Sequence, residues 1–143
     1  MTGDNRMNIL LPMLGMITLS GLMIATLFFS RAPSIIKHWG NLQHAKHSDD
    51  LRPNLPDRMR YITDNHNHLF EQPTLFYAIV IYIYLVKNAD DLHIQLAWGY
   101  VILRVLHSVI HLTTNNVSWR AVIFIMSGFC LLAMITRELI AVL

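Results

Sequence analysis

The sequence predicts an all-α integral membrane protein whose single domain, residues 1–143, is a four-helix up-down bundle. Of the 143 residues, 54% are hydrophobic and only 14% are charged, a balance unlike that of ordinary soluble domains. The apolar residues gather in long runs, and most charged residues lie between them. Two runs also carry polar side chains at helical spacing, which indicates that these helices face each other inside a bundle.

The first predicted span covers residues 9–29, a run without an ionisable side chain. At 1.5 Å per residue this run is about 30 Å long, the thickness of the hydrocarbon layer. From residue 31 the sequence turns polar and contains Pro33, Pro53 and Pro56, and prolines discourage a long continuous helix. We therefore expect a loop outside the membrane over residues 31–56.

The remaining three spans are predicted over residues 57–86, 92–112 and 118–140. A polar stretch at residues 87–91 separates the first two. The span at 92–112 has Arg104, His107 and His111 embedded in it, so it cannot face lipid on all sides. Ser118 is the expected N-cap of the last helix.

The distribution of Lys and Arg predicts the orientation in the membrane. The segment between the first two spans and the start of the second is rich in basic residues, namely Arg31, Lys37, Lys46, Arg52, Arg58 and Arg60, whereas the next turn has Lys87 alone. The positive-inside rule then places the first loop in the cytoplasm and both termini outward, across the inner (plasma) membrane if the source is a bacterium. The small net charge of +2 and the concentration of the basic residues in one loop argue against nucleic-acid binding.

Two polar stripes mark the candidate functional residues. Residues three or four apart share one face of a helix, and such stripes comprise Arg60, Asp64, Asn67, His68 and Glu71 in the second span and Tyr100, Arg104, His107, Ser108 and His111 in the third. Glu71 is seven residues beyond Asp64 and Arg104 is eight residues short of Leu112, so both lie about 10 to 12 Å deep from the cytoplasmic side. Because a lone charge at this depth is costly, we expect these two side chains to pair.

Other candidate residues leave several interpretations open. His107 and His111 are one helical turn apart, and with His68 they could form a haem, metal or quinone site or a hydrogen-bonded polar core. Arg120 lies at the start of the last helix, where it would either reach lipid headgroups or favour an anion such as a thiolate. Cys130, the only cysteine, has apolar neighbours and is expected to pack in the core.

Three motifs together resemble the MAPEG family, the membrane-associated proteins of eicosanoid and glutathione metabolism. They are Asn-His-Leu-Phe-Glu-Gln-Pro-Thr-Leu-Phe-Tyr at positions 67 to 77, Arg-Val-Leu-His at 104 to 107, and Arg-Ala at 120 and 121. The resemblance covers the last three spans, and the sequence is most similar to the uncharacterised bacterial branch of the family.

This resemblance implies a homotrimer that binds glutathione between neighbouring subunits at the cytoplasmic side and acts on a lipophilic small molecule. Glutathione is thus the implied cofactor of a possible transferase or peroxidase. By position, Arg120 corresponds to the residue that stabilises the glutathione thiolate and is the implied catalytic residue, and Glu71 and Arg104 correspond to the family's buried acid and base. The implied cofactor-binding residues are Asn67, His68, Glu71, Arg104, His107 and His111.

Three positions depart from the family pattern. The family has asparagine, arginine and tyrosine where this chain has His68, Asp64 and His111. A carboxylate at position 64 would repel a carboxylate of glutathione. A second function class therefore stays open, a non-catalytic accessory or scaffold subunit of a larger membrane complex.

Overall fold

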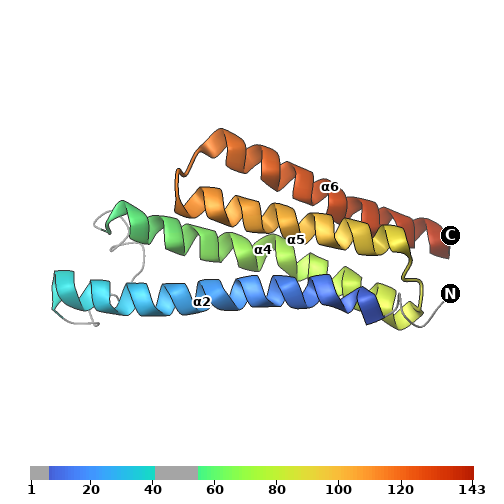
Figure 1. Ribbon diagram of the computed structural model, residues 1–143, viewed down its shortest axis with the longest axis horizontal. Coiled ribbons are helices and arrows are strands. Elements are labelled where there is room, and N and C mark those ends of the chain that lie inside the picture. The colour runs from blue at the N-terminus through green and yellow to red at the C-terminus, as the bar shows by residue number, and fades with distance from the viewer. Residues whose placement is uncertain (1–6, 41–54) are drawn as a thin grey trace.

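A computed structural model describes residues 7–40 and 55–143, and within these ranges the chain forms four helices. They are α2 (Leu10–Trp39), α4 (Asp57–Val86), α5 (Asp91–Leu112) and α6 (Val117–Val142). Figure 1 shows them side by side as an elongated bundle, in which the start of α2 and the end of α6 lie at the same end. The prediction of an all-helical protein with four helices is confirmed.

The helices pack most extensively as two pairs, α2 with α4 and α5 with α6, and α4 contacts all three other helices. Between α4 and α5 the rings of Phe76 and Tyr100 are stacked with centroids 4.4 Å apart, and both side chains are fully buried. Such stacked aromatic pairs contribute about 0.5–1.5 kcal/mol beyond their buried area. Both polar stripes therefore belong to helices that meet in the core.

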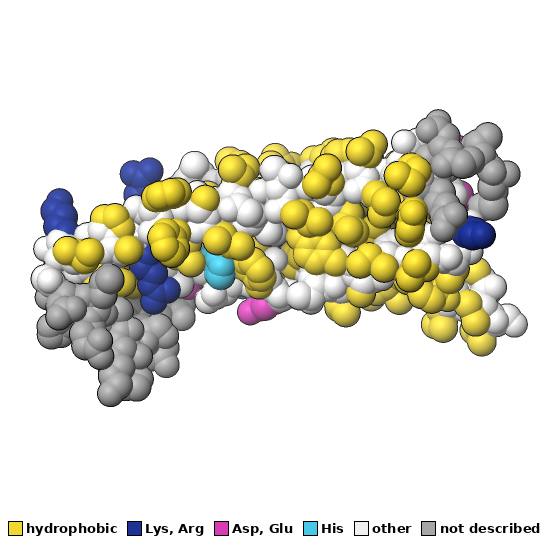
Figure 2. All heavy atoms as spheres, turned by 90° about the horizontal axis from the view of Figure 1, so that it is seen from below, with side chains coloured by type: hydrophobic (Ala, Val, Ile, Leu, Met, Phe, Trp, Pro, Cys, Tyr) yellow, Lys and Arg dark blue, Asp and Glu magenta, His cyan; other side chains and the backbone are white. Residues whose placement is uncertain are grey.

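Large apolar side chains cover the outside of the bundle. Figure 2 shows them along most of one face, with Lys and Arg side chains gathered toward the two ends. Among the described residues, three helical segments are long and apolar enough to cross a membrane: Leu10–Lys37, Asp57–Val86 and Val117–Val142. An exterior of this kind suits contact with acyl chains, as in an integral membrane protein. The fourth helix, α5, does not belong to this set, so its crossing of the bilayer stays a prediction.

The first helix is longer than the sequence predicted. We expected a loop from residue 31, but α2 continues to Trp39 and contains Pro33. Ile35 is 3% exposed, and its burial compensates for the backbone hydrogen bond that proline cannot donate. Gly40 ends the helix with φ +70°, a conformation that glycine adopts without strain, and donates its N–H to the carbonyl of Ile36 at 2.8 Å. The rest of the expected loop, 41–54, lies outside the described residues.

Side chains in the connecting turns fix where α5 and α6 begin. The carboxylate of Asp90 accepts the backbone N–H of His93 at 2.8 Å, and the amide oxygen of Asn116 accepts the backbone N–H of Trp119 at 3.2 Å. Each satisfies one N–H at a helix start that has no partner within the helix. The prediction of Ser118 as the cap of the last helix is therefore wrong, because Asn116 caps it.

Candidate functional site

Arg104 is the centre of the buried polar core. Its side chain is fully buried, donates from Nη1 to the amide oxygen of Gln72 at 3.1 Å and from Nη2 to the carbonyl of His68 at 2.6 Å, and lies over the ring of Phe124 with Cζ 5.4 Å from the ring centroid. Ser127 of α6 donates to the same Gln72 oxygen at 3.2 Å. Arg104 therefore joins α5 to α4, and Gln72 extends this link to α6.

The predicted pair between Glu71 and Arg104 is wrong. Glu71 points out of the bundle with 67% of its side chain exposed, and its Oε2 lies 3.5 Å from Nδ1 of His68. The next residue, Gln72, points inward and occupies the position beside Arg104 that we predicted for the carboxylate of Glu71. Adjacent residues lie about 100° apart around a helix, so the sequence placed the correct turn of α4 beside Arg104 but the wrong side chain.

Three imidazoles lie next to this core. The ring centroids of His68, His107 and His111 are 5.7 to 5.9 Å apart. His107 and His111 are buried, whereas 36% of the His68 side chain is exposed. Within the part of the chain that the structure describes, no group of three or more His, Cys, Asp or Glu side chains is arranged to hold a metal ion, and the geometry gives no support to the haem or metal interpretation.

Arg120 lies in the first turn of α6, close to the α5–α6 turn that positions it. Its Nη1 donates to the amide oxygen of Asn115, a residue with φ +49°, which asparagine tolerates better than most residues. The Nε–H of Arg120 is buried and has no hydrogen-bond partner among the described residues. Asn115 thus holds the guanidinium from one side.

Two pockets meet at Arg120 and His68. The first, of about 250 Å³, is polar and is lined by Asp64, Asn67, His68, Glu71 and Arg120. The second, of about 180 Å³, is lined by His68, His107, Val117, Arg120, Ala121 and Phe124. Apart from the wall that it shares with the first pocket, its surface is largely apolar. The structure therefore brings Asn67, His68, Glu71 and Arg120 together in one pocket, places His107 in the adjoining one, and leaves Arg104 and His111 among the buried residues behind them.

Sequence reasoning missed three polar residues near this site: Gln72, which is half-buried, and Ser127 and Asn65, which are buried. Gln72 lies within the motif at positions 67 to 77, but the motif does not indicate a role for it. Asn65 is fully buried, and its amide nitrogen and oxygen have no partner among the described residues. The available signal was helical spacing, because Asn65, Leu69, Gln72 and Phe76 follow each other at intervals of three and four.

A membrane helical bundle with two adjoining pockets, one polar and one apolar, is the class of protein that this fold and site define. A family model, that of the MAPEG family, matches residues 9–140, nearly the whole chain. The chain therefore belongs to the MAPEG family, which confirms the resemblance seen in the sequence and identifies it, at the level of the family, as a membrane protein related to glutathione or eicosanoid metabolism. Neither the curated proteins nor the solved structures gave a match.

Proposed function

We propose that this chain is a glutathione-dependent transferase or peroxidase that acts on a lipophilic electrophile taken from the membrane. The observation that carries the proposal is the pair of pockets that share Arg120 and His68. A charged tripeptide requires a polar pocket, and an apolar substrate requires an apolar one. The reacting groups of both must meet, and the shared wall at Arg120 is where the two pockets allow this.

The charges in the polar pocket fit glutathione in part. Arg120, which lines this pocket, supplies one cation for a thiolate or carboxylate. Asp64 and Glu71 supply two carboxylates, which suit the α-ammonium group of glutathione better than its two carboxylates. We infer that the ammonium end lies toward Asp64 and Glu71, with Asn67 beside them, and that the sulfur lies toward Arg120.

Glutathione supplies a thiolate, which is the nucleophilic form of the sulfur. A cation within hydrogen-bonding distance stabilises that anion and lowers the pKa of the thiol. Arg120 is suited to this task, because Asn115 fixes its guanidinium from the opposite side and the protein need not reorganise around the charge. Arg104, in contrast, is fully buried and bound to Gln72 and His68, so its role is to position the pocket wall.

The location of Glu71 supports assembly with further copies of the chain. This carboxylate lies midway along α4 and is 67% exposed, and a charge facing acyl chains near the bilayer centre costs roughly 2.5–3.5 kcal/mol on insertion scales. A neighbouring subunit would cover it and close the polar pocket. We therefore propose the homotrimer that is typical of the family, with glutathione bound between subunits.

The orientation in the membrane belongs to the same proposal. Figure 1 shows the chain direction reversing from each helix to the next, which supports an up-down bundle with four crossings. The basic residues near the start of α4 then support a cytoplasmic location for the polar pocket and an outward orientation of both termini. In a bacterium the membrane would be the inner one.

The test is a titration of the purified protein in detergent with glutathione, followed by thiolate absorbance in the ultraviolet. We expect a saturable thiolate signal at millimolar glutathione that Arg120→Ala abolishes. Arg58→Ala, which removes an exposed arginine near the start of α4, is the matched control and should leave the signal intact. No signal, or an equal signal in Arg120→Ala, would refute the role of Arg120.

The alternative is a non-catalytic accessory or scaffold subunit of a larger membrane complex. It is favoured by Asp64, whose carboxylate lines the pocket at a position where the family has an arginine. In that case a second membrane protein would co-purify in mild detergent at fixed stoichiometry, and glutathione would give no thiolate signal. Purification of a homotrimer alone that binds glutathione would exclude it.

A further inference from the structure

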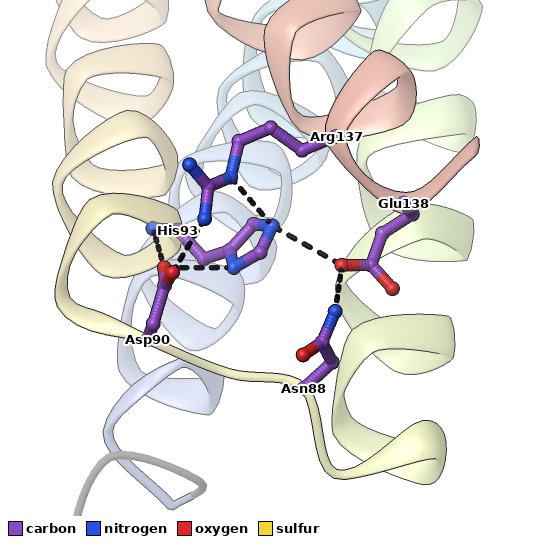
Figure 3. A network of polar contacts seen from close by, with 5 residues as sticks. All are labelled: Asn88, Asp90, His93, Arg137 and Glu138. Carbon is purple, nitrogen blue, oxygen red and sulfur yellow. Dashed lines mark hydrogen bonds and ion pairs between the residues drawn. The ribbon is translucent and has the colours of Figure 1, made fainter. Parts of the chain in front are cut away.

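A second polar cluster lies at the opposite end of the bundle from the polar pocket, where the α4–α5 turn meets the last turns of α6. Figure 3 shows its five members: Asn88, Asp90, His93, Arg137 and Glu138. His93 is 1% exposed and Glu138 is 4% exposed, although both can carry a charge. Buried ionisable groups at the end of a membrane bundle are costly and need a specific arrangement of partners.

One side of the His93 ring faces a constant partner. Nδ1 lies 2.9 Å from Oδ1 of Asp90, and that carboxylate is itself fixed by the backbone N–H of His93 and by the guanidinium of Arg137. Burial tends to raise the pKa of Asp90, but the hydrogen bond from His93 and the nearby positive charge outweigh it, and the pKa lies below its ordinary value. Nδ1 makes no hydrogen bond with the described residues, but an ionised carboxylate 2.9 Å away favours a proton over a lone pair on this nitrogen.

The other side of the ring faces two competing partners. Nε of Arg137 donates to Nε2 of His93 at 3.3 Å, and Oε1 of Glu138 lies 3.3 Å from the same Nε2. A single ring nitrogen cannot serve both: it accepts from Arg137 when it carries a lone pair, and it donates to Glu138 when it carries a proton. Glu138 also accepts from the amide of Asn88 at 2.8 Å, which holds the carboxylate in place in either case.

We propose that His93 is a proton-operated switch between α5 and α6, in which protonation of Nε2 exchanges Arg137 for Glu138 as the partner of the ring. Among the described residues, the charged groups in contact with His93 are Asp90, on the turn before α5, and Arg137 and Glu138, on α6. Adding the proton gives the buried Glu138 a charge-assisted hydrogen bond and releases Arg137 from the ring. Which side chain of α6 holds the ring thus depends on the pH at this face of the membrane.

The inference does not depend on glutathione, and histidine-selective ¹⁵N NMR of the detergent-solubilised protein tests it. At high pH we expect the His93 ring to be neutral with its proton on Nδ1, and at low pH we expect both nitrogens to be protonated. A neutral ring with its proton on Nε2 would overturn the proposal, because Arg137 could not then donate to it.

Two variants test the two partners. Glu138→Gln removes the partner of the protonated ring and should move the midpoint of the His93 transition to lower pH by about one unit, a tenfold change in proton affinity. Arg137→Gln removes the partner of the neutral ring and should move it to higher pH. His66→Gln, a change on α4 outside this cluster, is the control and should leave the midpoint unchanged. Shifts in the same direction in both variants, or no shift in either, would refute the switch.

Discussion

Replacing Gln72 with leucine tests whether the buried guanidinium depends on this amide. Leucine is close to glutamine in size but offers no hydrogen-bond acceptor, so Nη1 of Arg104 loses its partner at 3.1 Å. Hydrogen bonds to charged groups contribute about 1.5–3 kcal/mol, and Arg104 is fully buried, so water does not replace the lost acceptor. Ser127 keeps its bond to the carbonyl of Phe124 at 2.8 Å and adds little to the cost. We expect the free energy of unfolding to fall by about 2–3 kcal/mol.

The assay is unfolding in mixed micelles by titration with sodium dodecyl sulfate, followed by circular dichroism at fixed protein concentration. Gln95→Leu makes the same change at an exposed position of α5 and should alter the free energy of unfolding by less than about 0.5 kcal/mol. Glu71→Gln should also cost little, because 67% of the Glu71 side chain is exposed. If Glu71→Gln destabilised the protein as much as we expect for Gln72→Leu, while Gln72→Leu had no effect, the carboxylate would be the partner of Arg104 and our assignment would be wrong.

The same assay checks three further predictions. Gly21→Ala should stabilise the protein by about 0.5–1 kcal/mol, because an added Cβ meets nothing within 4 Å. Gly128→Ala should not give this stabilisation, because its Cβ would lie 3.2 Å from Nε2 of the hydrogen-bonded Gln72. Equal stabilisation at both glycines would contradict the packing of α6 on α4. Tyr77→Phe removes a hydroxyl that lies 3.2 Å from a serine hydroxyl of α2 and should cost about 1 kcal/mol; an unchanged free energy of unfolding would show that this contact is not made. Asp90 has a lowered pKa, so its contribution is full above its ordinary pKa and is lost as the pH falls below about 4; Asp90→Asn should remove this part of the acid destabilisation, and an identical pH profile in the variant would refute it.

Apolar run length and motif content predicted the fold. A run of about 20 apolar residues is long enough to cross the bilayer, and this criterion identified α2 and α6 without knowledge of their partners. The error at the end of α2 has a physical origin. Pro33 and the charges after it indicate a loop, whereas the helix continues because Ile35 is buried. Such tertiary burial is invisible in local sequence.

The candidate site was predicted less completely than the fold. Helical spacing correctly indicated that polar residues of α4 and α5 share an interface, but it could not distinguish Glu71 from Gln72, which are adjacent. Charge complementarity favours the carboxylate of Glu71 as the partner of Arg104. The structure shows that an amide oxygen and a backbone carbonyl accept hydrogen bonds from its two Nη atoms instead, a solution that charge counting does not suggest.

The cluster at the other end was missed for a different reason. Its members come from the α4–α5 turn, from the first turn of α5 and from the last turns of α6, and the last of these is far from the others in the sequence. Arg137 and Glu138 are adjacent charges near the end of a predicted span and resemble ordinary interface residues. Only the packing of α6 on α5 brings them to His93.

The central claim is that Arg120 stands between a glutathione pocket and an apolar pocket, and an electron cryo-microscopy map of the protein in nanodiscs with millimolar glutathione tests it most directly. The account predicts glutathione beside Asp64, Asn67 and Glu71, with its sulfur next to Arg120 and a neighbouring copy of the chain closing the pocket. Glutathione bound away from Arg120, or a polar pocket that stays empty at saturating glutathione, would contradict it.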